Sequence, residues 1–79
     1  MKDRIIEAIQ NTIPCQHLVV ELQGNHCSLE VVSEAFTGLN PVKRQQKVYA
    51  CIGDLIASGE LHAVNIKAYT PDTWAGRES

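Results

Sequence analysis

The sequence predicts one α+β domain, a two-layer sandwich in which two helices cover one face of a three-stranded mixed sheet. Three observations predict this fold: an amphipathic N-terminal helix, a hairpin whose register can be worked out from its residues, and a second helix followed by a strand that stops at a Thr-Pro pair. The expected order is α-β-β-α-β, in a single domain over residues 1–79 with an ordered core of about 2–75.

The first helix is expected over residues 2–12. Ile5, Ile9 and Ile13 recur at intervals of four, so they share one face of a helix, while charged residues take the other face. Pro14 disfavours helical geometry at the residue before it and ends the helix.

A hairpin follows, with Gly24-Asn25 as its two-residue turn. If Gln23 faces His26, the apolar residues of both strands fall on one face, and a slip of one residue would destroy this agreement. The apolar pairs are then Leu22 with Cys27, Val20 with Leu29, and Leu18 with Val31; the more polar face pairs Glu21 with Ser28, Val19 with Glu30, and His17 with Val32.

After a short turn of helix and a loop (34–41), the second helix is expected from Pro41 to Ala57, with Asn40 as its cap. Its inner stripe would comprise Val42, Gln45, Val48, Tyr49, Ile52, Leu55 and Ile56.

The third strand is expected over residues 61–70, because Pro71 cannot continue a strand ladder. Val64, Ile66 and Ala68 alternate onto its apolar face, in line with His62. The connection through the second helix implies a right-handed parallel crossover, and a turn around residues 72–74 and a polar tail complete the chain.

Composition narrows the classes of function. The formal net charge of −2 gives no overall basic footprint for nucleic acid. Three cysteines without a C-x-x-C motif fit a reducing cytosol, and no stretch approaches the roughly 18 apolar residues of a membrane span. We therefore expect a cytoplasmic protein that does not enter a membrane, a monomer or a weak homodimer when alone.

The sequence also argues against an enzyme. It contains no phosphate-binding glycine loop, no nucleophile elbow and no H-E-x-x-H motif. Glu21 and Glu30 share the polar face of the hairpin, where carboxylates are usually solvated rather than catalytic.

Histidines and cysteines are the residues that could hold a metal. Cys51 and Cys27 are expected to pack against the core, and Cys15, after the helix-ending proline, is expected to be partly exposed and not a ligand. His17 shows no feature beyond exposure. His26 follows the tight turn on the polar face and is free to point outward.

His62 allows two interpretations. It is a half-buried structural histidine whose ring caps a carbonyl at the helix-to-strand junction, or a metal ligand that the flexible Gly59-Glu60 segment presents at the edge of the molecule. One or two donors cannot complete a metal site, so in the second case a partner supplies the rest.

Three stretches carry a family resemblance: V-V-S-E-A-F-T-G at 31–38, V-K-R-Q-Q-K-V-Y at 42–49, and L-H-A-V-N-I-K-A-Y-T-P at 61–71, followed by Trp74. Together they resemble the BolA-like proteins, particularly a bacterial branch typified by IbaG, over essentially the whole chain. The resemblance implies an α-β-β-α-β fold similar to class II KH domains.

The resemblance also implies a function. BolA-like proteins act with monothiol glutaredoxins, forming a heterodimer that can share a [2Fe–2S] cluster with glutathione, so no cofactor is expected in the chain alone. The histidine that opens the last strand is a cluster ligand in that picture, and it corresponds to His62. The expected role is an adaptor in cluster assembly or trafficking, with a link to the stress response.

A second ligand comes from the loop between the first two strands in many members of the family. Here that turn is very short, and Gln23 stands where some relatives place a cysteine. His26 and Cys27 are the donors nearby, and we favour His26 because Cys27 is expected to point inward.

Nucleic-acid binding is the alternative. The family is also linked to transcription regulation, and Lys43, Arg44 and Lys47 form a small basic cluster that DNA or an acidic partner protein could contact. However, Gly38-Leu39-Asn40-Pro41 does not match the G-x-x-G loop of KH domains, and three cations would give only weak, salt-sensitive binding.

Overall fold

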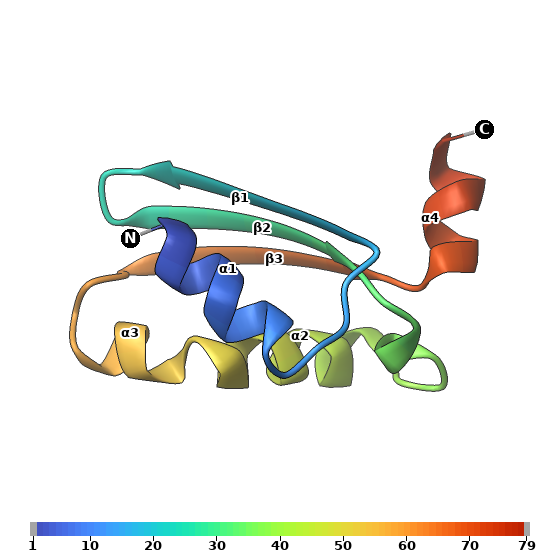
Figure 1. Ribbon diagram of the computed structural model, residues 1–79, viewed down its shortest axis with the longest axis horizontal. Coiled ribbons are helices and arrows are strands. Elements are labelled where there is room, and N and C mark those ends of the chain that lie inside the picture. Colours follow the sequence, from blue (N-terminus) through green and yellow to red (C-terminus); the bar gives the residue numbers. More distant parts are fainter. Residues whose placement is uncertain (1, 79) are drawn as a thin grey trace.

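The computed structural model describes residues 2–78, and the side chains of residues 2–76. A three-stranded sheet with four α-helices gives an α+β fold (Figure 1). The elements are α1 (Lys2–Gln10), β1 (His17–Gln23), β2 (His26–Val32), the 3-10 turn η1 (Glu34–Phe36), α2 (Pro41–Cys51), α3 (Gly53–Ala57), β3 (Ala63–Tyr69) and α4 (Pro71–Glu78).

The sheet has the order β1-β2-β3, with β1 antiparallel and β3 parallel to β2. The predicted hairpin register is confirmed at each of its pairs, from Gln23 with His26 to His17 with Val32. Gly24 adopts a φ of 63°, the left-handed conformation that the tight turn requires.

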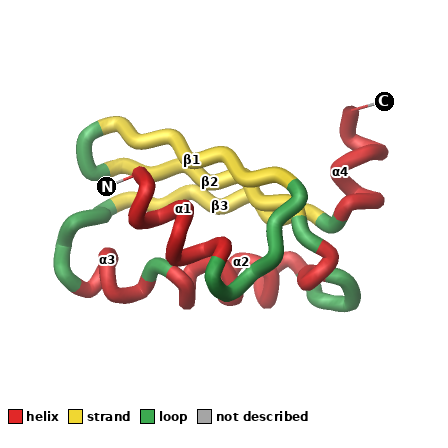
Figure 2. The backbone as a smooth tube through the Cα atoms, viewed as in Figure 1, coloured by secondary structure: helices red, strands yellow, loops and turns green. Residues whose placement is uncertain are grey.

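Helices α1, α2 and α3 lie together against one face of the sheet (Figures 1 and 2). The core fills the space between these two layers and consists of Ile5, Ile9, Ile13, Val20, Cys27, Leu29, Val31, Phe36, Val48, Ile52, Leu55, Leu61 and Ile66. Helix α1 ends at Gln10 rather than at residue 12, although Ile13 still donates its N–H to the carbonyl of Ile9 and is fully buried.

The predicted second helix is wrong in one respect, because it is two helices. The backbone at Ile52 has φ −114° and ψ 13°, outside the helical region, and its N–H bonds to Tyr49 three residues earlier. Gly53 then starts α3. Ile52 at this break and Leu55 after it are both buried in the core.

The predicted inner stripe of this segment is also partly wrong. Val48, Ile52 and Leu55 are buried, but Val42, Gln45 and Tyr49 are exposed. The cause is geometric: Val42 and Tyr49 lie on a side of α2 that faces away from the sheet, so a narrower stripe than predicted is enough to cover the core.

The C-terminal segment forms a helix where a turn and a polar tail were predicted. Thr70 accepts a hydrogen bond at its hydroxyl from the N–H of Thr73, and Pro71 occupies the first helical position. Helix α4 lies beyond one end of the sheet, opposite the hairpin turn (Figure 1). Trp74 of this helix contacts His17 and Tyr69 on the sheet face away from α1 and α2.

Among residues 2–78, no helix has the length and apolar character needed to cross a membrane.

Candidate functional site

The approach to strand β3 determines where His62 lies. The strand begins at Ala63 rather than at residue 61, because Gly59 (φ 84°) and a bend at His62 interrupt the extended backbone. Leu61 is therefore buried and His62 exposed, the reverse of the predicted alternation. Within the strand itself the predicted alternation is correct, because Ile66 is buried and Val64 and Ala68 are half-buried.

The exposed position of His62 bears on the two interpretations of its imidazole. Among the described residues, none exchanges a hydrogen bond with this ring, so it caps no carbonyl at the junction. The backbone of His62 is held instead: its N–H donates to the carbonyl of Asn25 at 2.9 Å. The imidazole is thus presented at the end of the sheet on an anchored backbone.

That anchor brings His26 and His62 to the same end of the sheet. Asn25 directly precedes His26, and His26 is paired in register with Ala63, the residue after His62. Adjacent strands lie about 4.8 Å apart, so the two histidines belong to neighbouring backbone segments. Both side chains are exposed.

The segment before His62 is held on its other side by Glu60. Its carboxylate accepts hydrogen bonds from Ser58 Oγ at 2.9 Å and from Arg4 of α1, also at 2.9 Å. These bonds from Ser58 and then Arg4 lower the pKa of Glu60. Leu61, the residue after Glu60, is buried. The chain before the bend is therefore attached to α1 through Glu60, and the bend itself is attached to the hairpin through the hydrogen bond between His62 and Asn25.

Two imidazoles cannot close a metal site alone. Among the described residues there is no group of three or more histidine, cysteine, aspartate or glutamate side chains that could hold a metal ion. A metal centre at this edge would take its remaining ligands from another molecule.

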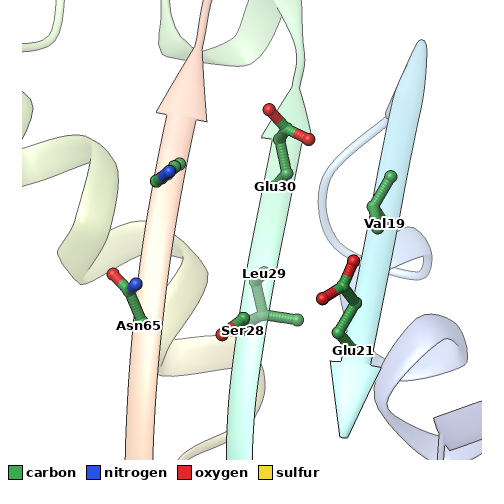
Figure 3. Close-up of a pocket in the computed structure, with 7 residues that line it drawn as sticks. Val19, Glu21, Ser28, Leu29, Glu30 and Asn65 are labelled. Atoms are coloured by element: carbon green, nitrogen blue, oxygen red, sulfur yellow. The ribbon is translucent and has the colours of Figure 1, made fainter.

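A shallow cavity of about 270 Å³ lies on the sheet face away from the helices (Figure 3). Glu21 of β1 and Glu30 of β2 both project from this face, with their carboxylates apart from each other. Lys67 is in register with Glu30, so the three charged side chains carry a formal net charge of −1. The lining residues are Val19, Glu21, Ser28, Leu29, Glu30, Asn65 and Lys67.

The comparisons with known proteins agree with this architecture. A family model described as BolA-like protein matches residues 8–73, which include both histidines. This chain belongs to the BolA-like family. It is 40% identical over 73 residues to the acid stress protein IbaG of Escherichia coli, covering 92% of this chain and 87% of that protein.

Solved BolA structures share the fold. BolA1 from Arabidopsis thaliana is 31% identical with a TM-score of 0.82, over 90% of this chain and 92% of that one. The BolA domain of SufE1 from the same plant is 34% identical with a TM-score of 0.82 and the same coverage.

The cysteines of this BolA-like chain are poorly placed as ligands. Cys27 is only 2% exposed on the core side of β2, and burial raises the pKa of its thiol. Cys15 and Cys51 are half-buried and donate their thiol hydrogens to the backbone carbonyls of Ile13 and Lys47. Cys27 directly follows His26, but its side chain lies on the core side of the sheet, so none of the three thiols is exposed beside His26.

The predicted basic cluster is only partly available in this BolA-like structure. Lys43 and Lys47 are exposed on α2. Arg44 is half-buried, and its Nε donates to the carbonyl of Leu39 at 2.8 Å, so this residue supports the loop before the helix. Asn40 caps the helix as predicted, with Oδ1 accepting from the N–H of Lys43 at 2.8 Å.

His17, predicted to have no role, takes part in a cluster on the sheet. Its ring stacks on Trp74, and its Nε2 lies 3.9 Å from a carboxylate oxygen of Glu30. Val32, which is between His17 and Tyr69 in register, is 1% exposed although it was assigned to the polar face. Two signals in the sequence could together have located this cluster. The predicted register places His17 opposite Val32, and the Thr-Pro pair at residues 70–71 can start a helix that contains Trp74.

Proposed function

We propose that this BolA-like protein is a non-enzymatic, cytoplasmic adaptor that binds a monothiol glutaredoxin and shares a [2Fe–2S] cluster with it and with glutathione. The observation that carries the proposal is the presence of two exposed histidines, His26 and His62, on neighbouring backbone segments at one end of the sheet. The stress-protein name of a relative that is 40% identical supports a role in the stress response.

The chemistry of the two donors supports this cargo. Two histidines can replace two cysteines on one iron of a [2Fe–2S] cluster, and the other iron then takes its ligands from the partner and glutathione. Cys27 would have to leave the core to bind iron, so His26 is the better second ligand.

The anchoring around His62 supports a binding role as well. Ligands whose backbone is already ordered pay less conformational entropy on binding. Here the N–H of His62 is bonded to Asn25, and Glu60 is bonded to Arg4 and Ser58. The end of the sheet that carries His26 and His62, here called the histidine edge, therefore needs little rearrangement to bind a partner.

The experiment reconstitutes the complex from this protein, a monothiol glutaredoxin, glutathione, iron and sulfide, and records its visible circular dichroism. We expect His62→Ala to change or abolish the spectrum and His26→Ala to weaken it. His17→Ala is the matched control, because His17 is the remaining histidine of the three and lies at the other end of the sheet. An unchanged spectrum with His62→Ala would show that His62 is not a ligand.

Nucleic-acid binding through α2 is the weaker proposal. Lys43 and Lys47 support it because both are exposed, whereas Arg44 is engaged with Leu39. Two to three neutralised phosphates give weak binding whose affinity falls as the salt concentration rises. Duplex affinity measured over a salt series, with Lys43 and Lys47 changed to glutamine, tests it; tight binding at physiological salt that the double variant loses would favour this function.

A further inference from the structure

The two exposed large hydrophobic side chains among the described residues are both on α2. Val42 is 63% exposed and Tyr49 is 45% exposed. They are seven residues apart, so they share one side of the helix and are separated by about 10 Å along its axis. Single exposed apolar residues are ordinary, but two aligned on one helix form a surface.

Polar and basic residues surround this pair. Gln46 lies between Val42 and Tyr49 on the same side of the helix, and Lys43 and Lys47 lie next to it. Helix α2 contains no acidic residue, although the chain as a whole carries a formal net charge of −2. The surface therefore combines apolar area with local positive charge.

The fold does not need these side chains. Val48 and Ile52 cover the core from this segment, and Asn40 caps the helix. An exposed valine and tyrosine contribute little to stability in the free protein, whereas tyrosine in particular is enriched at protein interfaces. The exposure is explained if another molecule covers it.

We propose that the outer surface of α2, formed by Val42, Lys43, Gln46, Lys47 and Tyr49, binds a partner protein that presents an apolar helix face bordered by carboxylates. Val42 and Tyr49 pack against the apolar face, and the two lysines pair with the carboxylates beside it. This surface is separate from the histidine edge, so the proposal does not depend on cluster binding.

A protein fits this surface better than a nucleic acid. Val42 is the more exposed of the two apolar residues, and an aliphatic side chain gains little against a phosphate backbone. Arg44, which would extend a phosphate-binding row, is bonded to the carbonyl of Leu39. Two lysines steer and orient an acidic partner without supplying most of the affinity.

Three probes separate the chemistries in nuclear magnetic resonance titrations of the labelled protein. The first is a synthetic helical peptide with leucines along one side and glutamates flanking them; the second replaces those glutamates by lysines; the third is an oligothymidine strand. We expect only the glutamate peptide to shift the signals of Val42 and Tyr49.

Variants then test the two parts of the surface. Tyr49→Ser and the double variant Lys43→Glu, Lys47→Glu should each weaken binding of the glutamate peptide about tenfold. Lys67→Glu is the matched charge control, since Lys67 lies on β3, and it should leave the affinity unchanged. Because all four substituted residues are exposed, far-ultraviolet circular dichroism should show an intact fold. If Tyr49→Ser does not fold, Val42→Ser takes its place.

Several outcomes would overturn the proposal. Binding of the lysine peptide with equal affinity would show that charge plays no part, and tighter binding of oligothymidine would assign the surface to nucleic acid. No shift with any probe, or shifts confined to other elements, would show that α2 is not a docking surface for this chemistry.

Discussion

The imidazole of His17 stacks on the indole of Trp74, with ring centroids 4.6 Å apart and an angle of 29° between the planes. The two residues are far apart in the sequence, one at the start of β1 and the other in α4. Tyr69 packs against the same indole with its centroid 5.6 Å away. The contact therefore attaches the last helix to the far edge of the sheet.

His17→Ala should loosen α4. Losing an aromatic pair costs about 0.5–1.5 kcal/mol, and the indole should become more accessible to water. Trp74 is the single tryptophan, so its emission maximum should move to longer wavelength. Gln16→Ala, at the preceding exposed residue, should leave the emission as it is; an equal emission maximum in wild type and His17→Ala would contradict the proposed attachment.

Glu60→Gln should change the pH dependence of stability. Because the pKa of Glu60 is lowered by hydrogen bonds from Ser58 and Arg4, the folded state favours the ionised carboxylate. Its contribution is complete above the ordinary glutamate pKa of about 4.3 and is lost as the pH falls through the lowered folded value. Urea unfolding from pH 7 to pH 3 should show the gap between wild type and Glu60→Gln closing at acid pH. A difference in the free energy of unfolding that grows as the pH falls would contradict this prediction.

The thiol of Cys27 should resist alkylation in the folded protein. The thiolate is the reactive form, and burial both raises the pKa of Cys27 and blocks access to it. Mass spectrometry after brief iodoacetamide treatment should show Cys51, which is half-buried, modified before Cys27. In urea the two rates should converge. Equal rates in the folded protein would mean that Cys27 reaches solvent more readily than its 2% exposure indicates.

The two sides of the helical segment 41–57 should respond differently to truncation. Ile52→Ala should cost about 2–5 kcal/mol in the free energy of unfolding, because Ile52 is 1% exposed and its removal leaves a cavity. Val42→Ala, on the exposed side, should change it by less than about 0.5 kcal/mol. Denaturant midpoints of the two variants measure the difference. Comparable losses would show that Val42 contributes to the core after all.

The hairpin is the part of the fold that local reasoning predicts best. Its apolar residues alternate on both strands, so a single register places Leu18, Val20 and Leu22 together against the helices. Gly24 restricts the turn to a two-residue loop. These constraints act within a few residues of one another and can be evaluated without knowing the rest of the chain.

The predictions from the sequence are wrong where tertiary packing determines the local backbone. The apolar residues of the second helical segment give no sign of a break at Ile52, because Val48, Ile52 and Leu55 keep the spacing of one continuous helix face. The alternation through His62 fails because the backbone bends before β3, and that bend is held by Asn25, distant in sequence. Sequence reasoning found the candidate histidines but not the way the fold presents them.

The parallel pairing of β2 with β3 implies an order of events during synthesis. A nascent chain that has emerged only as far as Gly59 already contains both strands of the hairpin, with His26 at its tip. The second imidazole joins it only after residues 60–69 have left the ribosome and β3 has paired with β2. Until β3 has paired with β2, the growing polypeptide has only one of the two histidines at this end of the sheet and cannot present the pair to any metal.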